Sequence, residues 1–93
     1  MFYEDNVTSF PALVKRLRVL DQDSGVRLLG EANGKKIFAF VTRFGPRYTV
    51  MTYTFGKDGA PGRRIQTLEF DGLSGVEGAL KMLVKGRLRA WIY

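Results

Sequence analysis

Residues 26–55 read VRLLGEANGKKIFAFVTRFGPRYTVMTYTF, and they carry the strongest local signals for secondary structure in the chain. It contains three runs rich in β-branched and aromatic residues, separated by Asn33-Gly34 and by Gly45-Pro46. Asn-Gly between two such runs is a strong hairpin signal, because both central residues of the favoured two-residue turn take a positive φ. The stretch therefore predicts three consecutive antiparallel strands over 26–32, 35–44 and 47–55.

Helical patterns flank these strands. Apolar residues recur every three or four positions over 9–20, and Thr8 or Ser9 can cap this helix while Pro11 suits its first turn. A second helix is predicted to begin with a capping box made by Ser74 and Glu77. It is expected to end at Gly86, as glycine commonly closes a helix.

The remaining segments complete the predicted domain. A glycine-rich loop over 56–62 leads into a fourth strand over 63–70. Residues 87–93 alternate in polarity and are either a fifth strand or a tail docked on a partner. The predicted fold is a single α+β domain, residues 1–93, with a four-stranded antiparallel meander and an N-terminal and a C-terminal helix on one face.

The two hairpin turns determine which side chains share a face, because side chains alternate across a strand. Pairing across Asn33-Gly34 places Leu29 opposite Phe38, and pairing across Gly45-Pro46 places Phe38 opposite Tyr53. One face is then aliphatic and matches the apolar stripes of the two helices. The other face mixes rings with charges: Arg27, Leu29, Glu31, Lys36, Phe38, Phe40, Phe44, Arg47, Met51, Tyr53 and Phe55. The register of 63–70 stays open: one alternative adds Arg63, Ile65 and Thr67 to this face, the other Arg64, Gln66 and Leu68.

Basic residues concentrate in the same region. The chain has 15 Lys and Arg against 9 Asp and Glu, for a net charge of +6. Residues 34–66 hold seven bases and one acid, so the middle third carries the whole excess. A positive field localised on one supersecondary unit favours a negatively charged partner.

A face with aromatic rings and cations suits single-stranded nucleic acid. Unpaired bases stack on Phe or Tyr, worth roughly 1–3 kcal/mol per base, while Lys and Arg meet the phosphates. The sequence therefore predicts a non-enzymatic protein that binds single-stranded DNA or RNA with little sequence specificity. The candidate contacts are Arg27, Lys36, Phe38, Phe40, Phe44, Arg47, Tyr53, Phe55, Lys57, Arg63 and Arg64. Two alternatives remain for this face: a homodimer interface, or a plain core beneath the helices.

Composition narrows the other function classes. The chain has no Cys and no His, which excludes disulfides, thiolate metal sites and the commonest general base. We expect no metal and no small-molecule cofactor. No apolar run approaches 18 residues and the N-terminus is unlike a signal peptide, so we expect a cytoplasmic protein with no membrane contact.

Two further functions are compatible with this composition. Tyr53, Arg47 and Lys36 could serve a small basic ribonuclease that works without a metal. Alternatively, Trp91 and Tyr93 could anchor a protein-interaction module, since these residue types dominate interface energetics.

The stretch Gly59-Ala-Pro-Gly-Arg-Arg-Ile-Gln-Thr-Leu68 is a Pro-Gly-basic-basic run that leads into the last strand of the predicted meander. In this run and in the order of four strands and a helix, the middle of the chain resembles the positive cofactor four family of single-stranded-DNA-binding transcriptional coactivators. The family's four strands map onto 26–70 and its helix onto 74–85. The resemblance implies a curved sheet that grips one strand of nucleic acid, and a dimer formed through the helices. It implies contacts by Lys36, Phe38, Lys57, Arg63 and Arg64.

Overall fold

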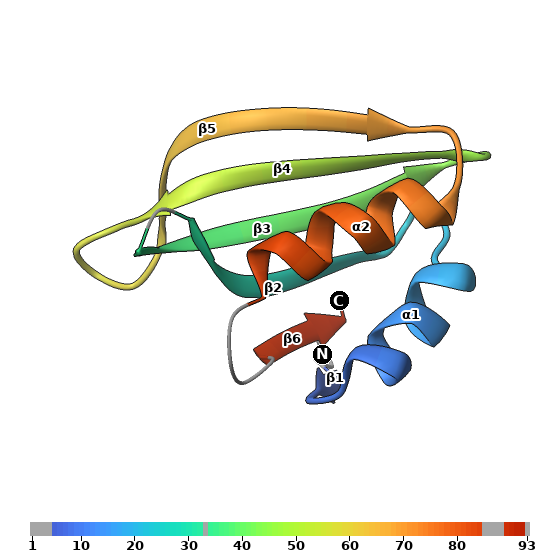
Figure 1. Cartoon of the computed structure of the whole chain (residues 1–93), viewed down its shortest axis with the longest axis horizontal. Coiled ribbons are helices and arrows are strands. Elements are labelled where there is room, and N and C mark those ends of the chain that lie inside the picture. Colours follow the sequence, from blue (N-terminus) through green and yellow to red (C-terminus); the bar gives the residue numbers. More distant parts are fainter. Residues whose placement is uncertain (1–4, 33, 85–88, 93) are drawn as a thin grey trace.

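The structure is a computed structural model that describes residues 5–32, 34–84 and 89–92. Its elements, in chain order, are β1 (Asp5–Val7), α1 (Phe10–Arg18), β2 (Gly25–Ala32), β3 (Lys35–Phe44), β4 (Arg47–Phe55), β5 (Pro61–Phe70), α2 (Leu73–Leu83) and β6 (Arg89–Ile92). All strands belong to one antiparallel sheet in the order β1-β6-β2-β3-β4-β5. Both helices pack on the same side of this sheet (Figure 1). The described helices are all too short and too polar to cross a membrane.

The α+β class is confirmed, but the sheet is wider than the predicted four-stranded meander. The meander is β2–β5, and two short strands extend it at the β2 edge. After β5, helix α2 runs back across the sheet, and the chain then pairs β6 with β2 (Figure 1). The N-terminal segment adds β1 to β6. Of the uncertain segment 87–93, residues 89–92 are therefore a strand, while 87, 88 and 93 lie outside the described residues.

Helix α1 begins as predicted. Ser9 is the N-cap, and its hydroxyl accepts a hydrogen bond from the Ala12 N–H at 3.3 Å. Pro11 occupies the first turn, where its missing N–H removes no helical hydrogen bond. Leu13 and Leu17, four positions apart, are fully buried against the sheet.

Helix α2 begins differently from the prediction. Gly72 is the N-cap in an extended conformation, and no side chain caps the helix. Ser74 consequently lies inside the first turn, so the predicted capping box with Glu77 is wrong. A capping box requires the serine at the non-helical N-cap position, which glycine occupies here. Gly86, the predicted end, lies outside the described residues.

The predicted register of the hairpins is confirmed. Leu29 pairs with Phe38, and Phe38 pairs with Tyr53. Gly45 has a φ of 61° in the β3–β4 turn, a conformation that favours glycine at the first position of a two-residue hairpin loop. The alternation of side chains therefore continues without interruption from β2 to β4.

Strand β5 follows neither of the two predicted registers over its whole length. Thr67 pairs with Met51, so the odd-numbered residues at this end share the aromatic face. A register shift between Thr52 and Tyr53 then brings Arg64 opposite Tyr53. A β-bulge of this kind leaves one residue unpaired and exchanges the faces of those that follow.

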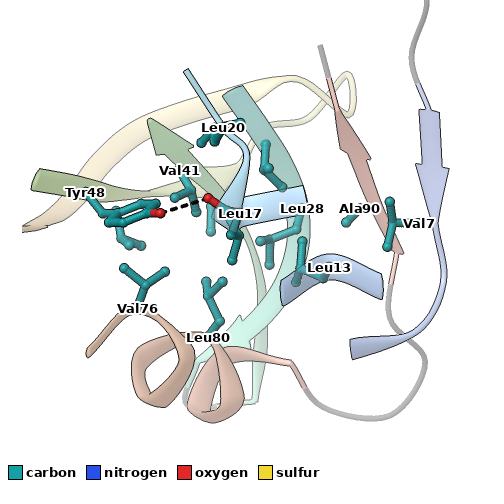
Figure 2. Packing of buried hydrophobic residues seen from close by; sticks show 13 residues of the cluster. Val7, Leu13, Leu17, Leu20, Leu28, Val41, Tyr48, Val76, Leu80 and Ala90 are labelled. Atoms are coloured by element: carbon teal, nitrogen blue, oxygen red, sulfur yellow. Dashed lines mark hydrogen bonds between the residues drawn. The ribbon is translucent and has the colours of Figure 1, made fainter. Parts of the chain in front are cut away.

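The hydrophobic core lies between the helices and the aliphatic face of the sheet, as predicted. Figure 2 shows helix residues such as Leu17 and Leu80 pointing toward Leu28 and Val41 of the sheet. The fully buried large side chains are Leu13, Leu17, Val26, Leu28, Val41, Val50, Val76 and Leu80. The Tyr48 hydroxyl, buried in the same core, donates a hydrogen bond to the Leu17 carbonyl at 2.8 Å (Figure 2). This bond ties β4 to the C-terminal end of α1.

Arg43 has a structural role on the helix side. Its guanidinium donates to the carbonyls of Arg18 at 2.9 Å and Gly45 at 2.8 Å, and it lies 5.1 Å from the centre of the Tyr48 ring. The Arg18 carbonyl belongs to the last turn of α1, where helix carbonyls have no partner within the helix. Arg43, one of the seven bases in the middle third, therefore links α1 to the β3–β4 hairpin through hydrogen bonds.

Candidate nucleic-acid interface

The face of the sheet opposite the helices, here called the open face, carries the predicted mixture of rings and charges. The alternation along each strand and the observed pairing place the following residues on it: Arg89 and Trp91 of β6, Arg27, Leu29 and Glu31 of β2, Lys36, Phe38, Phe40 and Phe44 of β3, Arg47, Met51, Tyr53 and Phe55 of β4, and Arg64, Thr67 and Glu69 of β5. None of these residues belongs to the helix-packed core cluster. The interpretation that the aromatic face is the core beneath the helices is therefore wrong.

Four rings from β3 and β4, here called the aromatic cluster, contact one another at the middle of the open face. Phe38 and Phe55 stack with centroids 5.0 Å apart and planes 8° apart. Phe40 meets Tyr53 edge to face at 5.4 Å and lies 6.3 Å from Phe38. Such contacts fix ring orientation, because stacked and edge-to-face pairs are favoured electrostatically. The cluster is a pre-organised apolar surface.

The members of the aromatic cluster differ in exposure. Phe55 is 40% exposed, and Phe40 and Tyr53 are half-buried. Phe38, a predicted contact, is only 7% exposed although it lies on the open face, so its ring offers little surface for a base to stack on. The physical reason is that Phe55 stacks on it from the neighbouring strand. Phe38 therefore lies beneath the surface of the cluster, and Phe55 is the ring of this stacked pair that a ligand can contact.

Cations border the rings of the cluster. The Lys36 ammonium lies 6.0 Å from the centre of the Phe55 ring, within cation–π distance. Arg64 is opposite Tyr53 across the β4–β5 pair and is exposed. Lys57 and Arg63, also predicted contacts, are exposed at the β4–β5 end of the sheet. The structure therefore places Lys36 and Arg64 beside the aromatic cluster, and Lys57 and Arg63 at the neighbouring end of the sheet.

Trp91 joins the open face through β6. It pairs with Arg27, whose guanidinium lies 5.2 Å from the indole centre, and Arg89 lies 5.9 Å from the same ring. Arg89 and Trp91 were not among the predicted contacts, because residues 87–93 could form either a strand or a tail docked on a partner. A signal was present in the sequence, because the alternation of 89–92 places residues 89 and 91 on one face of a strand and residues 90 and 92 on the other. The structure buries Ala90 on the helix side, so Arg89 and Trp91 belong to the open face.

A groove of about 520 Å³ runs between this arginine–tryptophan group and the β4–β5 turn. It lies within the range of about 300–1,000 Å³ that is usual for sites of small organic ligands. Its lining combines the aromatic and apolar residues Leu29, Phe38, Phe55, Pro61 and Trp91 with Arg27, Arg89, Asp58, Gly59 and Ala60. Both the rings and the cations needed for a nucleotide thus border one depression.

The β4–β5 turn lines part of the groove, but its backbone amides are not arranged to bind phosphate. The Gly56 N–H donates to the Ala60 carbonyl at 2.7 Å, and the Gly59 N–H donates to the Gly56 carbonyl at 3.1 Å. The Ala60 N–H donates to the Asp58 carboxylate at 3.1 Å. Because these amides bond within the turn, they are not directed at a ligand.

Two predicted contacts lie away from the aromatic cluster. Phe44 and Arg47 flank the β3–β4 turn, about 13 Å along the strand from Phe40 at roughly 3.3 Å per residue. Phe44 is 75% exposed, whereas Arg47 lies 3.8 Å from Glu69 and 3.5 Å from Asp71. These carboxylates offset part of the positive charge at this end. Phe44 and Arg47 therefore form a separate region of the open face, where the positive charge is weaker.

The structure separates one of the predicted ribonuclease residues from the other two: Lys36 and Tyr53 lie at the aromatic cluster, whereas Arg47 lies at the other end of β4. Tyr53 and Arg47 are six positions apart on β4, about 20 Å at the usual rise per residue. The Tyr53 hydroxyl points to the Met51 sulfur at 3.8 Å. Within the described ranges, no group of three Asp or Glu side chains is placed to hold a metal ion.

Comparison with known proteins does not assign the chain. No protein-family model, no curated protein and no solved structure matches it. The resemblance to the positive cofactor four family, drawn from the order of strands and helix over 26–85 and from the stretch 59–68, therefore stays a prediction.

Proposed function

We propose that the open face binds single-stranded nucleic acid, DNA or RNA, without catalysing a reaction. The observation that carries this proposal is the shared location of rings and cations on the sheet face that the helices leave uncovered. Rings that already contact one another lose little entropy when a base stacks on them, and cations at both sides of the cluster can meet successive phosphates.

An unpaired strand suits this surface better than a duplex. Phe55, Phe40 and Tyr53 offer ring surface at the middle of the sheet. Bases in a duplex are stacked on each other and cannot reach such rings, whereas unpaired bases can. Stacking in the middle of the sheet and phosphate contacts at the sides provide affinity that does not itself depend on which base is bound.

The test is a fluorescence anisotropy titration of a labelled ten-nucleotide thymidine strand, compared with a duplex of equal length, at several salt concentrations. We expect tighter binding of the single strand and a linear decrease of log K with log salt, with a slope of about −0.7 per phosphate contacted. No binding at low salt, or equal affinity for the duplex, would falsify the proposal.

A second proposal concerns self-association. Strand β5 is an outer strand of ten residues, and Pro61–Thr67 are all exposed, whereas the opposite outer strand β1 has three residues. A long outer strand can pair with another chain through its free backbone groups. We therefore propose a homodimer that joins two open faces along β5.

Light scattering over a range of concentrations tests this proposal. We expect the mass of a dimer for the unmodified chain and of a monomer for Thr67→Pro, since proline removes a backbone donor from the strand. A monomeric mass for the unmodified chain at high concentration contradicts the proposed dimer.

A further inference from the structure

The groove on the open face contains one acidic residue, Asp58, opposite two arginines. A carboxylate weakens the attraction of a site for phosphate, so it is unexpected in a groove that serves general electrostatic binding alone. Asp58 is held in place by the β4–β5 turn, since its Oδ1 atom accepts the Ala60 N–H at 3.1 Å. Gly59, with a φ of 80°, allows the turn to fold back in this way.

The chemistry of a carboxylate decides what it can recognise. An ionised carboxylate accepts hydrogen bonds and donates none, and its two oxygens have about four lone-pair positions. The bond from Ala60 uses one of these, which leaves the others for a ligand. Among the four bases, guanine alone presents two neighbouring donors, N1–H and N2–H₂, on its Watson–Crick edge. Adenine, cytosine and thymine each place an acceptor beside a donor on that edge.

We infer that the groove holds the base of one guanine nucleotide of the bound strand, with its Watson–Crick edge toward Asp58. This inference rests on the proposed function and names the base that the same site prefers. The stacked pair of Phe38 and Phe55 forms one side of the groove, and the partly exposed ring of Phe55 offers a surface for the base. The phosphates lie toward Arg27 and Arg89, at the side of the groove formed by β2 and β6.

The arrangement separates the two charges of the site. Arg27 and Arg89 are both held near the Trp91 ring, at 5.2 Å and 5.9 Å from its centre. Asp58 enters the groove from the β4–β5 turn instead. A nucleotide has the matching polarity, because its phosphate is negative and the guanine edge is a donor. Trp91 acts as a positioning residue for the arginines.

The experiment compares a ten-nucleotide thymidine strand with the same strand carrying a single central guanine. We expect the guanine to raise the affinity of the unmodified chain about tenfold, the usual size of a two-bond base contact. Hypoxanthine at this position, which retains N1–H but lacks the N2 amino group, is expected to give a smaller gain. A central adenine or cytosine is expected to give none.

Asp58→Asn is the decisive variant. The asparagine oxygen can still accept the Ala60 N–H and preserve the turn, but the second side-chain atom becomes a donor. We expect the guanine preference to disappear while the affinity for pure thymidine strands stays equal or rises slightly. Asp23→Asn is the matched control, because it makes the same charge change at an exposed turn outside the groove. It should leave the tenfold preference intact.

The outcomes separate this inference from the proposed function. If thymidine strands bind and guanine adds nothing, or if Asp58→Asn keeps the preference, the guanine site is refuted and the nucleic-acid interface stands. If no single strand binds at low salt, both are refuted. Thermal unfolding of each variant, followed by circular dichroism, establishes that a changed preference comes from a folded chain.

Discussion

The two faces of the β2–β5 sheet are built from alternate residues of the same strands, yet they differ in composition and in burial. Leu28 is fully buried beneath the helices, whereas its neighbour Leu29 is half-buried in a groove with two arginines. The helix-side face is aliphatic, and its few polar groups, such as the Tyr48 hydroxyl, have partners. The open face instead combines rings in mutual contact with cations. The helix-packed core thus lies on one side of the sheet, and the face that we propose for binding lies on the other.

The largest expected effect on stability comes from substituting two adjacent leucines, one on each face of the sheet. Leu28→Ala removes a fully buried side chain and should lower the free energy of unfolding by about 3–4 kcal/mol. Leu29→Ala should cost less than half of that, because its side chain is partly in contact with water. Urea denaturation of both variants measures the difference. Equal losses would show that the open face is packed as tightly as the core.

Two rings of the aromatic cluster are expected to have different roles within the open face. Phe38→Ala should destabilise the fold by about 3 kcal/mol, since Phe38 is almost fully covered. Phe55→Ala should affect stability less but reduce single-strand affinity about tenfold, the effect of losing one base-stacking surface. Denaturation and anisotropy titrations on the same samples distinguish the two roles. Unchanged affinity in Phe55→Ala would argue against stacking on this ring.

Removing one buried hydroxyl tests the helix-side face alone. Tyr48→Phe deletes the hydroxyl that donates to Leu17 and should cost about 1 kcal/mol of stability. Nucleic-acid affinity should not change, because Tyr48 is on the face away from the rings. Thermal unfolding and a titration at one salt concentration suffice. A fall in affinity would mean that the two faces are coupled.

The smallest effect concerns a single cation. Lys36→Gln should reduce the magnitude of the salt-dependence slope by about 0.7, the value for one phosphate contact on a single strand. Lys15→Gln, on the exposed side of α1, is the matched control and should leave the slope unchanged. Both slopes come from titrations over a tenfold range of salt. Identical slopes in the two variants would place Lys36 outside the interface.

Local sequence patterns predicted the structure correctly where a hairpin turn determines which side chains of two strands share a face. The positive φ of Gly45 and the pairing of Phe44 with Arg47 fix the parity of β3 against β4, so the composition of both faces followed from 26–55. The N-cap at Ser9 likewise depends on residues within one helical turn. By contrast, the predicted capping box at Ser74 failed, because Gly72 offered an equally local alternative start.

Side-chain alternation and composition along the chain were enough to predict the α+β class, the two faces and the charge that gathers in the middle third. The pairing of β6 with β2, which brings Trp91 beside Arg27, came from three-dimensional packing, since pairing between distant strands leaves no local pattern in the sequence. The same packing decided that Phe38 lies under Phe55 and that the β4–β5 turn brings Asp58 to the groove. Burial and proximity depend on which atoms pack around a side chain, and the order of residues along the chain does not specify that.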